Sequence, residues 1–262
     1  MIDADKLNSA LSAVGARIDE IILYDMTDST NTRAKEYEKE HPDNKKTVLL
    51  VANGQSAGRG RMGKSFSSLE DVGIYMSLIL HPTDTPESAT SITAVAAVAL
   101  ARAIKSVSGL DTGIKWVNDI YFGDRKLAGI LAESATTSDG KLAYLVLGMG
   151  INVYKTGYPD EISDIAISIE DATGYKISRE ELIAQTVSEI LTLSKSHDCK
   201  TIYDEYLARS IVIGKEVEVI GACERYPARA IGITPDFSLT VELDSGEIRT
   251  LHSGQISTKI KK

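Results

Sequence analysis

The stretch Gln55-Ser-Ala-Gly-Arg-Gly-Arg-Met-Gly-Lys-Ser-Phe66 follows directly on a run of apolar residues, and it decides how the chain is interpreted. Three glycines alternate here with Arg59, Arg61 and Lys64. Glycine lets the backbone adopt left-handed angles and approach a ligand closely. The interleaved cations add charge where backbone N–H groups also point, which suits an anion. The loop therefore indicates a small-anion site, although plain surface turns and nucleic-acid contacts use similar loops.

The composition is that of an ordinary globular protein with few special features. The 262 residues are 43% hydrophobic and 25% charged, which allows one large domain with a small satellite. The net charge of −8 argues against a dedicated nucleic-acid binder, since such proteins normally carry a basic face. Cys199 and Cys223 lack a zinc-like spacing, so we expect neither a structural metal nor a disulfide framework.

The N-terminal residues and the apolar segments bear on location. The start of the chain lacks the basic and apolar regions of a signal peptide. The apolar run 92–104 is interrupted by Thr93 and Arg102 and is too short to span a bilayer. A cytoplasmic protein is the expectation. The residues before about position 21 hold one short helix, which leaves no room for a winged-helix DNA-binding domain.

Hydrophobic periodicity divides the chain into a mixed α/β part and a short β-rich part. Strands are predicted over 47–52, 74–80, 114–116, 120–122, 126–133 and 141–153, and helices over 4–16, 32–40, 88–107 and from 179 onward. Ser178 and Glu181 have the spacing of a capping box. After residue 211 the predicted strands are 215–220, 228–233, 239–243 and 248–251, separated by Gly, Pro and Asp turns. We therefore expect domains over 1–210 and 211–262.

Four further segments lie at predicted strand ends or turns, where ligands are usually held. They contain Ser29-Thr-Asn31, Lys115-Trp-Val-Asn-Asp119, Lys126-Leu-Ala-Gly-Ile-Leu131 and Gly148-Met-Gly-Ile-Asn152. Each segment alone has an ordinary structural interpretation. A serine there can cap a helix, the tryptophan can fill core space, and a lone Gly-x-Gly is common. Their joint occurrence with the glycine-rich loop is what indicates a function.

In this order the segments resemble the biotin–protein ligase family, the biotin–[acetyl-CoA-carboxylase] ligases. The family pattern has a Ser-Thr-Asn cap, a Gln-x-x-Gly-Arg-Gly-Arg loop, and Lys-Trp-x-Asn-Asp, Lys-x-x-Gly-Ile-Leu and Gly-x-Gly-Ile-Asn motifs, all present here. The resemblance implies an α+β fold: a class II synthetase-like catalytic domain with a mixed sheet and helices, plus a small SH3-like β-barrel. It also implies the form without an N-terminal DNA-binding domain, with no DNA or membrane partner.

The resemblance implies a two-step reaction that suits the cations. Biotin and MgATP form biotinyl-5′-AMP, and a lysine of a biotin carboxyl carrier protein then takes the biotinyl group. The first step brings a carboxylate against a triphosphate, and like unit charges about 4 Å apart repel by roughly 4 kcal/mol at an effective dielectric constant of about 20. Cationic side chains with Mg²⁺ offset this repulsion. No protein ligands for the metal are assigned, and a homodimer is left open.

The resemblance also implies a role for each motif. The expected catalytic residues are Lys126, Arg61 and Asp119. The expected biotin-binding residues are Ser29, Thr30, Asn31, Gln55, Arg59, Gly60, Arg61 and Lys126. The expected nucleotide-binding residues are Gly58, Lys64, Phe66, Asn118 and Asn152. Lys64 and Phe66 stand where the family commonly has Arg and Trp, and a lysine does not reproduce the planar fork of an arginine.

Two alternatives stay open from the sequence. A lipoate or octanoate ligase or transferase shares the architecture, but it would need a different basic-glycine motif and a pocket for a long apolar tail. A non-catalytic nucleic-acid-binding regulatory module could use the Arg-Gly loop, and the net charge of −8 counts against it.

Overall fold

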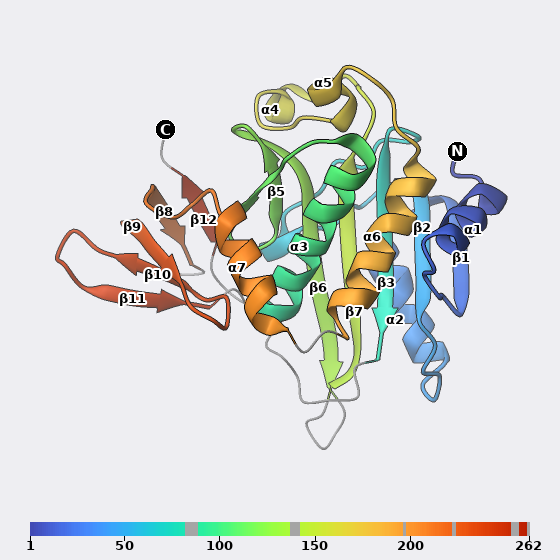
Figure 1. Cartoon of the computed structure of the whole chain (residues 1–262), viewed down its shortest axis with the longest axis horizontal. Helices are drawn as coiled ribbons and strands as arrows, with labels where there is room; N and C mark the ends of the chain where they lie inside the picture. Colours follow the sequence, from blue (N-terminus) through green and yellow to red (C-terminus); the bar gives the residue numbers. More distant parts are fainter. Residues whose placement is uncertain (82–88, 137–141, 196–197, 222–223, 253–256, 261–262) are drawn as a thin grey trace.

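Two β-sheets and the helices around them make up the computed structural model, which describes residues 1–81, 89–136, 142–195, 198–221, 224–252 and 257–260 (Figure 1). The seven-stranded sheet has the order β1-β2-β3-β7-β6-β5-β4, and the five-stranded sheet has the order β11-β10-β9-β8-β12. Cys223 and the first residue of the predicted strand 141–153 lie outside the described residues. A mixed sheet with helices and a separate C-terminal sheet confirm the predicted α+β class.

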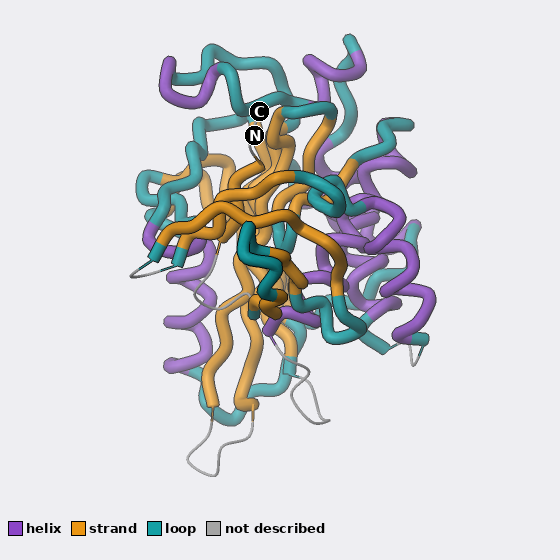
Figure 2. The backbone as a smooth tube through the Cα atoms, turned by 90° about the vertical axis from the view of Figure 1, so that its left-hand side faces the viewer, coloured by secondary structure: helices purple, strands orange, loops and turns teal. Residues whose placement is uncertain are grey.

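The seven-stranded sheet is covered by helices on both faces (Figure 2). Its strands are β1 (Glu20–Thr27), β2 (Val48–Gln55), β3 (Gly73–Leu80), β4 (Gly113–Lys115), β5 (Asp119–Phe122), β6 (Arg125–Thr136) and β7 (Leu142–Asn152). β1 pairs with β2 in parallel, and the other neighbours are antiparallel. β2 and β3 are buried almost throughout, which explains their nearly continuous apolar runs.

The sequence predicted some of the helices and missed others. They are α1 (Ala4–Ala13), α2 (Thr30–Glu40), α3 (Ala89–Ser108), α4 (Asp160–Ser163), α5 (Ile169–Thr173), α6 (Arg179–Leu193) and α7 (Cys199–Arg209). β1, α4, α5 and α7 were not predicted. Ser178 accepts the N–H of Glu181 as expected, but the reciprocal capping box is formed by Ser168 and Asp171 at the start of α5.

The apolar helix α3 is the central helix of the core. Its segment Ser91–Ser108 is longer than the apolar run 92–104, and among the described residues it alone has the length and hydropathy to cross a membrane. However, 67% of that segment is buried inside the protein. Small side chains such as Ala94, Ala97 and Ala101 let α3 pack closely on its neighbours, which is the pattern of a core helix.

The five-stranded sheet continues the core of the rest of the chain. Its strands are β8 (Glu216–Ile220), β9 (Arg225–Ile233), β10 (Leu239–Glu242), β11 (Ile248–Leu251) and β12 (Ser257–Ile260). Its inward side chains, including Val217, Ala228 and Val241, belong to the same buried cluster as α3 and the seven-stranded sheet. In Figure 1 the sheet stands beside α7.

The pairing of β6 with β7 creates a strip on one face of the sheet that has few side chains. Gly129 of β6 lies opposite Gly150, and Leu131 lies opposite Gly148. Because side chains alternate along a strand, Gly148 and Gly150 share one face while Met149 and Ile151 enter the core on the other. A Cβ at Gly148 would lie 2.0 Å from Asn31 Oδ1, and one at Gly150 would lie 2.5 Å from the Phe66 ring. The glycines therefore make room for side chains that meet over the sheet.

Candidate active site

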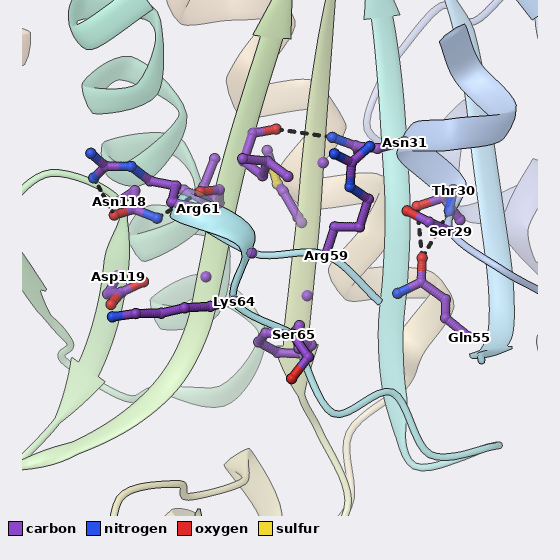
Figure 3. A pocket seen from close by; sticks show the side chains of 18 of the residues that line it. Ser29, Thr30, Asn31, Gln55, Arg59, Arg61, Lys64, Ser65, Asn118 and Asp119 are labelled. Atoms are coloured by element: carbon purple, nitrogen blue, oxygen red, sulfur yellow. Dashed lines mark hydrogen bonds between the residues drawn. The ribbon is translucent and has the colours of Figure 1, made fainter. Parts of the chain in front are cut away.

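A pocket lies over this strip, between the glycine-rich loop and the start of α2 (Figure 3). Most predicted site residues line it: Ser29, Thr30, Asn31, Gln55, Arg59, Gly60, Arg61, Lys64, Phe66, Asn118, Asp119 and Lys126. The pocket thus brings together segments that are far apart in the sequence. Four cationic side chains and a single carboxylate line it among the described residues, so the pocket suits an anionic ligand.

Two predicted nucleotide-binding residues do not line this pocket. Gly58 lies at the base of the loop, where its carbonyl accepts the N–H of Phe66 at 2.9 Å. A Cβ at Gly58 would lie 2.5 Å from the Phe66 carbonyl oxygen, so this glycine serves the packing of the loop. Asn152 instead lines a smaller neighbouring pocket with Tyr75, Tyr154 and Tyr158. Its amide lies 3.4 Å from the Lys126 carbonyl, below the main pocket.

The end of the pocket at α2 is polar and neutral. Ser29 occupies the N-cap position of α2, but its side chain makes no capping hydrogen bond, so the plain cap interpretation is wrong for its hydroxyl. The N–H of Thr30 donates to Gln55 Oε1 at 2.8 Å, and Gln55 Nε2 donates to Ser68 Oγ at 2.9 Å. These bonds fix the orientation of the Gln55 side-chain amide at the wall of the pocket.

Both the oxygen and the nitrogen of the Asn31 side-chain amide make hydrogen bonds. Ser77 Oγ lies 2.6 Å from Asn31 Oδ1 and 2.8 Å from Thr30 Oγ1. Because Ser77 has one hydroxyl hydrogen, it donates to Asn31 and accepts from Thr30. Asn31 Nδ2 donates to Glu133 Oε2 at 2.8 Å. Neither Ser77 nor Glu133 was predicted; a lone serine within the apolar strand β3 was the available signal for Ser77.

Glu133 joins the neutral end to the loop. Its carboxylate lies 2.8 Å from Lys35 Nζ and 3.8 Å from the Arg59 guanidinium. Burial acts to raise the pKa of Glu133, but hydrogen bonds from Lys35 and Asn31 outweigh it and hold the pKa below its ordinary value. Glu133 is therefore ionised at neutral pH. It follows the Lys126–Leu131 motif by two positions, and nothing in the local pattern distinguished it.

The other end of the pocket holds Arg61 and Lys126 beside two motif residues. Arg61 Nη1 donates to Asn118 Oδ1 at 3.1 Å, and Lys126 Nζ lies 2.6 Å from Asp119 Oδ1. Figure 3 shows Arg61 pointing toward Asn118 while Arg59 points the opposite way, toward Asn31. Burial lowers the pKa of Arg61, and the charge of Asp119 acts in the opposite direction. An arginine remains protonated even so.

The glycine-rich loop closes over the pocket as a small hairpin. Gly60 N–H donates to the Lys64 carbonyl at 2.7 Å, and Arg59 pairs with Ser65. Met62 at the tip has φ 55°, a left-handed angle that is uncommon for a residue other than glycine. At the far end of the loop, the Phe66 ring lies over Gly150, with Lys126 Nζ 5.9 Å from its centroid. Met62 and Ser65 also line the pocket, although neither was predicted to.

Metal ligands are sparse in the described part of the chain. No group of three or more His, Cys, Asp or Glu side chains there is placed to hold a metal ion. Asp119 is already engaged by Lys126.

Comparisons with known proteins agree with one another. The model of the biotin/lipoate A/B protein ligase family matches residues 23–152. The bifunctional ligase/repressor BirA of Bacillus subtilis (strain 168) is 32% identical over 247 residues, which is 90% of this chain and 73% of that relative. The biotin–[acetyl-CoA-carboxylase] ligase of Mycobacterium tuberculosis (strain ATCC 25618 / H37Rv) is 32% identical over 178 residues, covering 66% of this chain and 64% of the relative. The biotin protein ligase from Aquifex aeolicus, solved in complex with biotin and ATP, has a TM-score of 0.79 at 26% identity, covering 93% of this chain and 100% of the other.

Proposed function

The chain belongs to the biotin–protein ligase family, and from that premise we propose how its pocket performs the reaction. The protein is an ATP-dependent biotin ligase. One observation supports the residue roles that follow: the pocket has a neutral polar end at Ser29–Asn31 and a cationic end at Arg61 and Lys126, joined by the glycine-rich loop. A ligand with a polar neutral ring at one end and a carboxylate at the other fits that division of charge.

The neutral end binds the ureido ring of biotin. An amide such as that of Asn31 or Gln55 can donate and accept at once, which matches a cyclic urea with its carbonyl and two N–H groups. The hydroxyl of Ser29 adds a further donor and acceptor. The carboxylate then extends along the glycine strip toward Lys126. A long apolar acyl tail could not bond to the donor and acceptor positions that these amides still have beside their protein partners, which disfavours lipoate and octanoate.

The cationic end activates the carboxylate. A carboxylate oxygen attacks the α-phosphorus of ATP, the bond to the β-phosphate oxygen breaks, and pyrophosphate leaves with the electron pair. Lys126 and Arg61 offset the repulsion between the two anions and the charge that develops at the α-phosphate. Lys126 can turn from Asp119 to the phosphate when the ligand enters, because its ammonium rotates on a flexible stem.

Mg²⁺ would be bound by the triphosphate of ATP and would add positive charge there. Asp119 is the one carboxylate among the described pocket-lining residues, so the remaining oxygen ligands would come from phosphates and water.

The second step transfers biotin to an acceptor. The free amine of a lysine on a biotin carboxyl carrier protein attacks the carbonyl carbon of the adenylate. AMP leaves with the electron pair of the anhydride bond, and the amine loses a proton. Asp119 lies at the cationic end of the pocket, where its carboxylate can orient the incoming ammonium. The same family context supports a cytoplasmic enzyme with domains at 1–210 and 211–262.

Biotin-dependent exchange of pyrophosphate into ATP tests these roles. Lys126→Ala and Arg61→Ala are expected to lower the exchange rate by about 10²- to 10³-fold, since each removes a charge that stabilises the transition state. Lys105→Ala is the matched control, because Lys105 is 53% exposed and pairs with Asp111 away from the pocket.

Wild-type rates in either pocket variant would overturn the assignment, provided that thermal unfolding shows both variants folded. Replacing biotin by lipoate or octanoate checks the substrate: exchange supported by either acid as well as by biotin would contradict the role of the amides.

A further inference from the structure

The turn between β9 and β10 reaches the Lys115–Asp119 motif. Trp116 Nε1 donates to the Phe237 carbonyl at 2.8 Å, across 121 positions of sequence. Both residues are buried, at 3% and 5% exposure, so this hydrogen bond is shielded from water. Trp116 is the single tryptophan of the chain. The motif that faces the pocket with Asn118 and Asp119 is therefore attached to the five-stranded sheet on its other side.

Two tyrosines of α7 complete the attachment. The Phe237 ring packs edge-on against Tyr206 and Tyr203, with centroids 5.3 Å and 5.9 Å away. Tyr206 Oη donates to the Val117 carbonyl at 3.2 Å, and Tyr203 Oη donates to the Ile233 carbonyl at 2.6 Å. The side chain of Trp116 is thus held by the Phe237 carbonyl, and the carbonyl of Val117 is held by Tyr206, which packs on the Phe237 ring.

The turn itself is held in one conformation. Phe237 has φ 62°, a left-handed angle that a bulky side chain rarely adopts, so its surroundings must impose it. Phe237 N–H donates to the Thr234 carbonyl at 2.8 Å, and Thr234 N–H donates to the Ser238 carbonyl at 2.9 Å. The fully buried Ser238 donates to Asp236 Oδ2 at 2.7 Å. Asp236 therefore sets the shape that aims the Phe237 carbonyl at Trp116.

Trp116 and Val117 directly precede Asn118 and Asp119. These two residues contact the cationic side chains of the pocket. Asn118 Nδ2 and its carbonyl both bond to Ile130 of β6, at 2.7 Å and 2.9 Å, and Asn118 Oδ1 accepts from Arg61. Asp119 pairs with Lys126. Since Trp116 is only two peptide units from Asn118, a shift of its indole would move the groups that hold Arg61 and Lys126.

We propose that the turn Thr234–Ser238 positions the adenylation end of the pocket, acting through Trp116 and Val117 on Asn118 and Asp119. Trp116, Phe237 and Asp236 are positioning residues, because none of them lines the pocket. The inference rests on the proposed function, since it concerns the same site. It assigns the five-stranded sheet an effect on the nucleotide step that requires no contact between the turn and ATP.

Two side-chain hydrogen-bond donors, Trp116 and Tyr203, allow a matched comparison. Trp116→Phe and Tyr203→Phe each remove one side-chain hydrogen bond to a carbonyl of the β9–β10 hairpin, at Phe237 and Ile233 respectively. Only the first bond continues to the pocket. Trp116→Phe is expected to raise the KM for ATP or lower kcat of pyrophosphate exchange by about ten- to a hundredfold, as a small misplacement of catalytic groups does. Tyr203→Phe is expected to keep both constants.

Asp236→Ala tests the same connection from the other side and keeps the tryptophan. The altered turn is expected to shift the emission of Trp116 to longer wavelength and to change the same kinetic constant as Trp116→Phe. Wild-type KM and kcat in folded Trp116→Phe and Asp236→Ala, or equal losses in Tyr203→Phe, would overturn the proposal. A wild-type protein without biotin-dependent exchange would instead contradict the proposed function itself.

Discussion

Gly148 shows how a single missing Cβ determines the pocket. The Asn31 amide occupies the space where that Cβ would stand, 2.0 Å from Asn31 Oδ1. Ser77 and Glu133 then hold the two ends of the amide, so its donor and acceptor directions are set before any ligand arrives. Such preorganisation lowers the entropy lost on binding. The Gly-x-Gly motif is thus a packing requirement of Asn31.

Gly148→Ala is expected to displace Asn31 and to weaken biotin binding by at least about tenfold, since buried partners of the amide lose their hydrogen bonds. Gly232→Ala is the control, because no atom lies within 4 Å of a Cβ there. Calorimetric titration with biotin measures both variants. Equal affinities for wild type and Gly148→Ala would show that Asn31 does not bind the ring.

At the scale of elements, Glu133 connects α2 and the glycine-rich loop to β6. Lys35 and Asn31 come from α2, and Arg59 comes from the loop. A half-buried carboxylate with three polar partners stabilises the fold only while it is ionised. Its lowered pKa means that this contribution is fully present above the unfolded value of about 4.3 and is lost as the pH falls through the lower folded value.

Glu133→Gln is expected to lower the free energy of unfolding by about 1 kcal/mol at pH 7, the size of a hydrogen bond to a charged group after partial compensation. The difference from wild type is expected to shrink as the pH falls below the unfolded value of about 4.3 and through the lower folded pKa of Glu133. Urea unfolding at several pH values measures this. Glu247→Gln is the control, because Glu247 pairs with Arg249 at an exposed site and such pairs contribute little. A difference that stays constant at every acidic pH at which the protein remains folded would contradict the ionic role.

At the scale of the whole molecule, the two sheets share one hydrophobic core. A single cluster of buried side chains runs from β2, β3 and α3 into β8, β9 and β10. The residues 211–262 are few for an independently stable domain. The Trp116–Phe237 hydrogen bond and the Tyr203–Ile233 hydrogen bond add polar contacts across the same boundary. We propose that 1–210 and 211–262 are structural domains that fold as one unit.

Thermal unfolding is therefore expected to show one transition. Trp116 fluorescence reports the boundary between the sheets and far-UV circular dichroism reports the whole chain, so coincident curves would indicate cooperative unfolding. Scanning calorimetry adds the comparison of calorimetric and van't Hoff enthalpies. A separate early transition in the fluorescence alone would show that the five-stranded sheet detaches first.

The sequence predicted the elements whose signals are local. The apolar runs at β2, β3 and β7 and the small residues of α3 predicted strands and helix within a few residues. The short helices α4 and α5 and the edge strand β1 were not predicted, because they are too short or too exposed to show a clear hydrophobic periodicity. The motif residues Arg61, Asn118 and Lys126 were placed in one pocket by resemblance. Glu133 was missed because nothing local distinguishes it, and the lone serine of the apolar strand β3 was the only local signal for Ser77.

By itself, the sequence determined the chemistry of the loop, the order of the motifs and the family. The tertiary structure alone decided which of those groups meet: Arg61 with Asn118, Lys126 with Asp119, and Asn31 with Ser77 and Glu133. It alone decided that Asn152 and Gly58 do not line the main pocket and that the Phe237 carbonyl accepts from Trp116. The physical reason is that residue type and spacing act over a few positions, whereas contacts between distant segments depend on strand register and on how helices pack over a sheet.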